Sequence, residues 1–189
     1  MIQVAESIIV LRIETQRLIR RGLSEDDISF LFEHFGKDEI NEYVSDDNVT
    51  SIGEAKEFYE KYIAPRPHLF RLRLVVKETG RLIGTLGFYG IDRMNKRAIV
   101  GADLMKKHWS RGPMSESLQG LINYGFEEMG LNRIEASSDP QNLRSLRLME
   151  RCGFKKEGVL RQRFYYKGAF HDDAIYSLLK QEWESGKRG

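Results

Sequence analysis

Cysteine and proline are scarce in this chain, and their scarcity narrows its class. The 189 residues include one cysteine, Cys152, and four prolines. A single thiol provides neither an internal disulfide nor a cysteine cluster for a metal, so we expect a cytoplasmic protein without a metal centre. No Pro-, Gly- or Ser-rich tract offers a linker, and we therefore expect a single domain over residues 1–189.

The chain also lacks a large excess of positive or negative charge, and it lacks a long apolar run. The chain has 30 Lys and Arg residues against 28 Asp and Glu, a formal net charge of +2. Non-specific nucleic-acid binding needs a basic surplus, so this balance argues against it. No apolar run is long enough to cross a bilayer, and the first ten residues contain Glu6 without a basic start. We expect neither membrane insertion nor a secretory leader.

Hydrophobic periodicity predicts a mixed α/β domain with a largely antiparallel sheet. Two capping boxes, Ser24–Asp27 and Ser51–Glu54, open amphipathic segments. The strand–helix–strand passage in the middle of the chain is the expected ligand site. The predicted strands are 8–21, 69–76, 81–89, 97–104, 133–138, 159–166 and 172–179, with the later helices at 114–129 and 142–152.

The segment from His108 to Ser115 lies between a predicted strand and a predicted helix. Such a turn directs free main-chain N–H groups and the positive end of the helix dipole at one point, which suits a pyrophosphate. Gly112 permits a close approach that a side chain would prevent, Arg111 offers charge to phosphate oxygens, and Pro113 suits the first helical turn. An ordinary strand-to-helix turn is the alternative, because the segment carries neither a Walker nor a dinucleotide fingerprint.

Five ordered blocks resemble the GNAT superfamily of N-acetyltransferases, and within it the RimJ/RimL-type branch that acetylates ribosomal-protein N-termini and related amines. They cover nearly the whole chain and follow the order of the family. The block that begins at Trp109 resembles the family's cofactor loop. The blocks are Thr15–Arg21 with Ser24–Asp27, Leu82–Gly87, Trp109–Ser117, Asp139–Ser145 with Cys152–Phe154 and Glu157–Gly158, and Asp172–Trp183.

The resemblance implies the GNAT fold, a sheet of six to seven strands with helices on both faces, and acetyl-CoA as the donor. The strand that ends near Leu104 and Met105 would splay from the strand at 133–138 and expose main-chain groups to pantetheine. The loop would hold the pyrophosphate. Asn142 would hydrogen-bond the pantetheine or acetyl region, cap a helix, or do both. The predicted cofactor-binding residues are Leu104, Met105, Trp109, Ser110, Arg111, Gly112, Pro113, Met114, Ser115 and Asn142.

Direct acetyl transfer needs a neutral amine, a polarised thioester carbonyl and a proton for the departing thiolate. Ser145 matches the serine that is thought to donate a proton to the departing thiolate in this branch. The alternative is that Ser145 is simply a polar residue in the first turn of a helix. The branch often carries a Glu where this chain has Ile99. Asp103, on the same strand face, and Glu135, on the next strand, are the candidate bases; either is otherwise a paired strand carboxylate. His171 is a further candidate.

The resemblance therefore implies an N-acetyltransferase that acts on a primary amine, either a protein N-terminus or a small amine such as a polyamine. Ser110 stands where the family's loop customarily has its first glycine. If Ser110 and Pro113 disrupted the array of N–H groups, the chain would instead be a catalytically degenerate regulatory module that binds acyl-CoA. A third alternative is a ribosome- or RNA-associated protein, which would use basic residues within 155–163 as its binding patch. The near-neutral net charge argues against this alternative. Many relatives dimerise, so a homodimer is one option.

Overall fold

The computed structural model describes residues 13–15, 17–43 and 48–187, which form a mixed α/β fold. Eight strands make one sheet in the order β1-β2-β3-β4-β5-β6-β8-β7. All neighbours are antiparallel except β5 and β6, which are parallel. The strands are β1 (Ile13–Glu14), β2 (Leu18–Gly22), β3 (Leu69–Val76), β4 (Leu82–Asp92), β5 (Arg97–Leu104), β6 (Arg133–Ser138), β7 (Lys155–Tyr166) and β8 (Ala169–Leu179).

The predicted fold class is confirmed, with differences at the ends of the chain. The extended start expected over 8–21 contains two short strands that pair with each other, which is why the sheet has more strands than predicted; residues 8–12 lie outside the described residues. No helix in the described ranges is long and apolar enough to span a membrane. The helices are α2 (Ile28–Phe35), α3 (Asp38–Asn41), α4 (Ile52–Tyr62), α5 (Pro113–Glu127), α6 (Leu143–Arg151) and α7 (Lys180–Gly186), with 3-10 turns η1 (Glu25–Asp27) and η2 (Lys106–His108).

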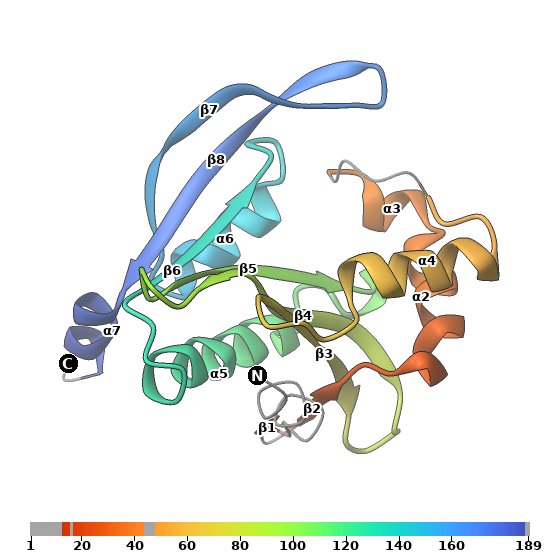
Figure 1. Cartoon of the computed structure of the whole chain (residues 1–189), viewed down its shortest axis with the longest axis horizontal. Helices are drawn as coiled ribbons and strands as arrows, with labels where there is room; N and C mark the ends of the chain where they lie inside the picture. The colour runs from red at the N-terminus through yellow and green to blue at the C-terminus, as the bar shows by residue number, and fades with distance from the viewer. Residues whose placement is uncertain (1–12, 16, 44–47, 188–189) are drawn as a thin grey trace.

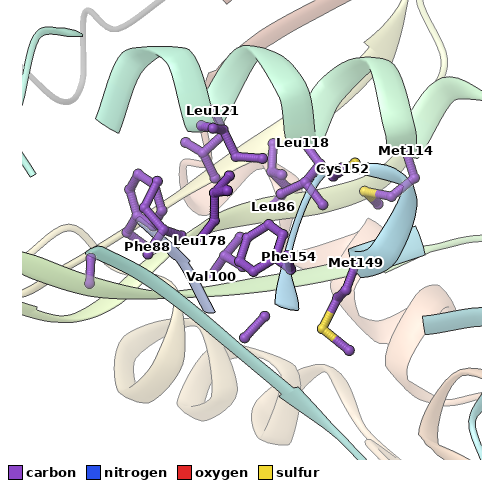
Figure 2. Packing of buried hydrophobic residues seen from close by; sticks show 14 of the residues in the cluster. Leu86, Phe88, Val100, Met114, Leu118, Leu121, Met149, Cys152, Phe154 and Leu178 are labelled. Atoms are coloured by element: carbon purple, nitrogen blue, oxygen red, sulfur yellow. The ribbon is translucent and has the colours of Figure 1, made fainter. Parts of the chain in front are cut away.

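A large apolar cluster lies between the sheet and α5. Successive side chains of a strand point to opposite faces, so Leu86, Phe88 and their neighbours across the sheet turn together toward this helix (Figure 2). Gly125 allows the close approach, because a Cβ there would lie 3.0 Å from the Phe88 ring. The predicted inward stripe of α5 is confirmed, and Cys152 is packed in the same cluster, where burial raises the pKa of its thiol. The α5 side chains in the cluster are Met114, Leu118, Leu121, Ile122 and Phe126.

The opposite face of the sheet contacts the N-terminal helices. His34 of α2 bonds to Asp103 of β5, and Arg73 of β3 pairs with Asp27 of η1. A second apolar cluster, which includes Leu31 of α2, packs α2 against α4. Figure 1 shows α5 beneath the sheet and α2 and α4 together at one end of it. Helices therefore cover both faces, as predicted.

The β7–β8 hairpin is longer than the sequence pattern indicates. It arches away from the rest of the sheet toward α3 (Figure 1). At its tip, Lys167 Nζ donates to the main-chain oxygen of Asn41 at 2.7 Å. This contact joins the last hairpin to the N-terminal helices.

The parallel strands β5 and β6 pair over a short stretch and then part. Among the described residues, their pairing covers Arg97–Ile99 with Arg133–Glu135. Beyond that point β5 continues along β4 to Leu104, while β6 continues along β8 to Ser138. The splay predicted between 97–104 and 133–138 is confirmed, and it leaves one main-chain edge of β5 open.

Candidate functional site

The loop that follows β5 has the backbone of an anion site. Ser110 and Gly112 have φ values of 59° and 89°, in the left-handed region that favours glycine. Pro113 is the first residue of α5. Glu116 donates its N–H to Gly112 O at 3.1 Å, so Met114 and Ser115 precede the first intrahelical bond and keep their N–H groups free of helix partners. A phosphate at this terminus would meet these N–H groups and the positive end of the helix dipole.

Three arginines surround this helix terminus. Arg17 forms an ion pair with Glu116 at 2.7 Å and donates to Arg111 O at 3.3 Å. A Cβ at Gly112 would lie 3.3 Å from Arg17 Nη2, so the glycine also fits a tight space. Arg151 of α6 donates to Ser115 Oγ at 3.3 Å. Arg111 is predicted to contact phosphate, whereas Arg17 and Arg151 reach the loop through the tertiary fold alone.

The side chains of the predicted cofactor loop are directed partly inward. Met114 is buried in the core, so its predicted contact would use its main chain. The Trp109 indole donates from Nε1 to Leu104 O at 2.7 Å, and the Arg144 guanidinium lies 3.7 Å from the centre of its ring. Trp109 therefore braces the end of β5 against α6.

The main chain at the end of β5 alternates in direction. Met105 donates its N–H to Ile83 O at 2.8 Å, so this group faces β4, contrary to the expectation that Met105 exposes it to the gap. Because hydrogen-bonded and non-hydrogen-bonded residues alternate in an antiparallel pair, Val100 and Ala102 turn their main-chain groups toward the parting of β5 and β6, as does the N–H of Leu104, whose oxygen is taken by Trp109. These are the groups that an extended amide-bearing ligand would meet.

Asn142 and Ser145 lie together at the start of α6. Asn142 Oδ1 accepts from the N–H of Ser145 at 3.3 Å, which is the N-cap role weighed from sequence. Within the described part of the chain, neither Asn142 Nδ2 nor Ser145 Oγ has a hydrogen-bond partner, and both residues are half-buried. Both groups are therefore free for a ligand while the cap remains intact.

A pocket of about 500 Å³ lies on the face of the sheet opposite α5, inside the curve of β7. It crosses the point where β5 and β6 part, because Ile99 and Glu135 form the last pair between these strands and both line it. Of the two predicted bases, Glu135 therefore faces a cavity. The lining residues are Tyr89, Ile99, Arg133, Glu135, Ala136, Ser137, Glu157, Gly158, Leu160, Arg163, Phe164 and Ile175.

The charges of this pocket are paired with one another. Arg133 donates to Glu135 Oε1 at 2.7 Å and makes two further bonds of 2.7 Å to Glu157. The Arg133 bonds, with one from the Ser177 hydroxyl, lower the pKa of Glu157 to about 2, and Glu157 in turn raises the pKa of Arg133. Glu135 Oε2 has a longer contact, 3.4 Å to Arg97 Nη1.

Asp103 lies outside this pocket, in a buried network. Its carboxylate accepts from His34 Nε2 at 2.6 Å, from the Thr85 N–H at 3.0 Å, and from the Thr85 hydroxyl and Arg71. Burial alone would raise the pKa of Asp103, but the charges of Arg71 and His34 outweigh burial and hold it well below its usual range. A carboxylate held in its charged form is a weak proton acceptor.

Sequence reasoning missed several residues near the site. His34 is completely buried, and its ring stacks on Phe30 with centres 5.0 Å apart. Asp173 is buried beside the pocket, where burial raises its pKa despite bonds from Ser137 and Arg163. Their partners are distant in sequence, so neither periodicity nor motif spacing could reveal them. His171, a further candidate base, donates from Nδ1 to Asp139 Oδ2 at 3.1 Å and stacks on Tyr166.

Comparisons with known proteins agree with this geometry. The family model described as "Acetyltransferase (GNAT) domain" matches residues 17–155. The uncharacterized N-acetyltransferase p20 of Bacillus licheniformis is 37% identical over 171 residues, which cover 89% of this chain and 96% of that protein. The [ribosomal protein uS5]-alanine N-acetyltransferase of Escherichia coli is 28% identical over 72% of this chain and 68% of its own length.

Polyamine enzymes appear in the same comparisons. The spermidine N(1)-acetyltransferase of Vibrio cholerae is 25% identical over 88% of this chain and 95% of that protein. A crystal structure of spermidine N-acetyltransferase from Vibrio cholerae in complex with CoA and spermine superposes with a TM-score of 0.80 at 22% identity, covering 90% of this chain and 99% of that one. This likeness is one of fold.

Proposed function

The chain belongs to the GNAT acetyltransferase family, and from this premise we propose that it transfers an acetyl group from acetyl-CoA directly to a primary amine. One observation carries the proposal: where β5 and β6 part, Ile99 and Glu135 line a pocket on the face opposite α5, and β5 continues from there to the loop at the start of α5. A donor bound along the open edge of β5 would bring its thioester to the parting. The acceptor amine would reach the same point from the pocket.

The chain offers groups for each part of the donor. The free N–H groups of Met114 and Ser115, with Arg111 and Arg151 beside them, suit the pyrophosphate. The open edge of β5 suits the pantetheine amides, because an extended amide chain pairs with a strand edge as an added strand would. Asn142 Nδ2 would donate to a pantetheine or acetyl carbonyl. The fit rests on the main-chain groups of Val100 and Ala102 that face the parting, and on the N–H groups at the start of α5.

The reaction forms a bond between the amine nitrogen and the thioester carbonyl carbon and breaks the carbon–sulfur bond. We propose Glu135 as the acceptor of the amine's proton, because it lines the pocket and its Oε2 has only a long contact. Ser145 Oγ would supply the thiolate's proton. A β5 main-chain N–H that faces the parting would stabilise the oxyanion. In this proposal Asp103 holds α2 on the sheet.

Two relatives are named for their acceptors, an alanine of ribosomal protein uS5 and spermidine, and both acceptors are amines. These two acceptors support an amine as the acceptor of this chain. Which amine it is must be inferred from the residues that line the pocket. We also propose that residues 1–189 form a single domain, that the protein is cytoplasmic and that it forms a homodimer.

The proposal is tested by measuring free thiol released from acetyl-CoA in the presence of an amine panel, together with calorimetry of acetyl-CoA binding. Gly112→Glu should abolish binding, because it places a carboxylate at the phosphate position. Gly80→Glu is the matched control, since Gly80 also has a positive φ, 65°, with open space around it in a remote turn. Equal affinity in the two variants would refute the placement of the donor. Binding without thiol release would support the regulatory module instead.

A further inference from the structure

We infer that the acceptor is a primary amine attached to an apolar or aromatic group, rather than a polyamine. The inference rests on the proposed function, because it assigns the pocket between β5, β6 and β7 to the acceptor. It concerns what surrounds the amine in this pocket: an apolar wall and charges that already neutralise each other.

The wall of the pocket is largely apolar. Ile99 and Ile175 come from β5 and β8, and Leu160 and Phe164 come from β7, facing Tyr89 of β4. Three of these side chains are exposed to solvent: Tyr89 by 38%, Leu160 by 47% and Phe164 by 40%. An apolar group that covers them gains the free energy of removing this surface from water, which the extended, charged chain of a polyamine does not.

Among the residues that the structure describes, every carboxylate lining the pocket already contacts an arginine, which leaves none without a partner for a second ammonium. Glu157 is held by two bonds from Arg133 and one from Ser177 at 2.6 Å, and Glu135 Oε1 is held by the same arginine. Arg133 is the partner of both glutamates of the lining, and Arg163 pairs with Asp173 beside the pocket. A polyamine would have to displace Arg133 from its carboxylates, and breaking such a charged pair is costly.

Arg163 adds a repulsive element at the rim. Its side chain is 42% exposed, and Nη1 bonds to the buried Asp173 at 3.0 Å. The guanidinium also lies 5.2 Å from the centre of the Phe164 ring. A second positive charge on the acceptor would meet this cation, whereas the face of an aromatic ring would not be repelled.

The experiment compares kcat/KM, from thiol release, for 2-phenylethylamine, 3-methylbutylamine, spermidine and 1,4-diaminobutane. We expect the two apolar amines to exceed the two polyamines at least ten-fold, the range typical of discrimination by an apolar pocket. Two peptides with an amidated C-terminus, Phe-Gly-Gly-amide and Lys-Gly-Gly-amide, are measured in the same assay. They show whether the preferred acceptor is a small free amine or a protein N-terminus that carries an apolar side chain. Equal or greater kcat/KM for spermidine would overturn the inference while leaving the acetyltransferase proposal standing.

Phe164→Ala should raise the KM for 2-phenylethylamine at least ten-fold and leave acetyl-CoA affinity unchanged. Tyr165→Ala is the matched control, because Tyr165 is the next residue on β7, is 64% exposed, and packs on Phe170 outside the pocket. Calorimetry of 2-phenylethylamine binding separates the two proposals. Saturable binding that only Phe164→Ala weakens supports the inference even if no amine is acetylated, whereas no saturable binding to the folded protein overturns it.

Discussion

At the scale of the residue, Asp103 shows how one carboxylate joins distant parts of the chain. It accepts bonds from His34 on α2, from Arg71 on β3 and from Thr85 on β4, although it belongs to β5. Each partner would be left with a buried, uncompensated polar group if the carboxylate were removed. Asp103 is therefore better suited to hold α2 on the sheet than to exchange protons with an acceptor.

Asp103→Asn should lower the free energy of unfolding by about 3–5 kcal/mol, as expected when one partner of a buried ion pair is removed. The folded-state pKa of Asp103 lies below its unfolded value of about 3.9, so the contribution is present above that value and is lost as pH falls. Urea unfolding should show the wild type losing stability from about pH 5 downward, and the variant losing less. A folded, equally stable Asp103→Asn protein with greatly reduced kcat would contradict this role and restore Asp103 as the base.

Glu135→Gln tests the other candidate base at the same scale. The amide keeps the shape of the side chain but cannot accept the amine's proton, so kcat should fall by about 10²–10⁴-fold with unchanged acetyl-CoA affinity. Unchanged kcat would show that the proton leaves by another group, for which the Ser137–Asp173 pair beside the pocket is the next candidate.

At the scale of the element, α6 combines a structural cap with groups for a ligand. Its N-cap residue uses Oδ1 for the helix, and its amide Nδ2 remains available. The same turn carries Ser145, and the last residue of the helix, Arg151, reaches the start of α5. A single short helix therefore touches two parts of the proposed donor site.

Two substitutions at Asn142 separate these roles. Asn142→Ala should destabilise the protein by about 1 kcal/mol, because the cap is lost, and should also weaken acetyl-CoA binding. Asn142→Ser should retain the stability, since serine caps equally well, but should bind acetyl-CoA as weakly as the alanine variant. Thermal unfolding and calorimetry provide the two readouts. Full affinity in the serine variant would show that Nδ2 does not contact the donor.

At the scale of the whole molecule, the sheet is divided where β5 and β6 part, and the two sides are linked elsewhere. The hairpin tip bonds to α3 through Lys167, and the ion pair of Glu39 with Lys106, at 3.2 Å, ties α3 to the end of β5. A ligand along β5 would add a further link across the division. Binding should therefore stabilise the entire fold.

Acetyl-CoA at about 100 times its Kd should stabilise the protein by about 2.7 kcal/mol, which corresponds to a rise in Tm of about 5–10 °C for a chain of this size. NAD is the comparison ligand, because it shares the adenosine and pyrophosphate but lacks the pantetheine that would pair with β5. Scanning calorimetry should show a much smaller shift with NAD. Equal shifts would indicate that the strand edge contributes nothing to binding.

The sequence by itself determined most of the elements and the turn that precedes α5, to which we assign the pyrophosphate. The stripe of α5 and the alternation of β3 to β5 follow from local periodicity, and Gly112 with Pro113 marks the start of α5. It did not show the first residues of β7, Lys155 and Lys156, because charged and exposed residues carry no apolar alternation; pairing with β8 makes them a strand. The short helices α3 and α7 lack a strong pattern for the same reason.

Only the tertiary structure decided how these elements make a site. The direction of the Met105 N–H depends on the register of β5 against β4, and the neutral charge of the pocket depends on Arg133 meeting Glu157 from another strand. His34 and Asp103 are 69 residues apart and share one buried bond. Local propensity is fixed by near neighbours along the chain, whereas burial, pairing and charge compensation are fixed by neighbours in space, which a single sequence does not specify.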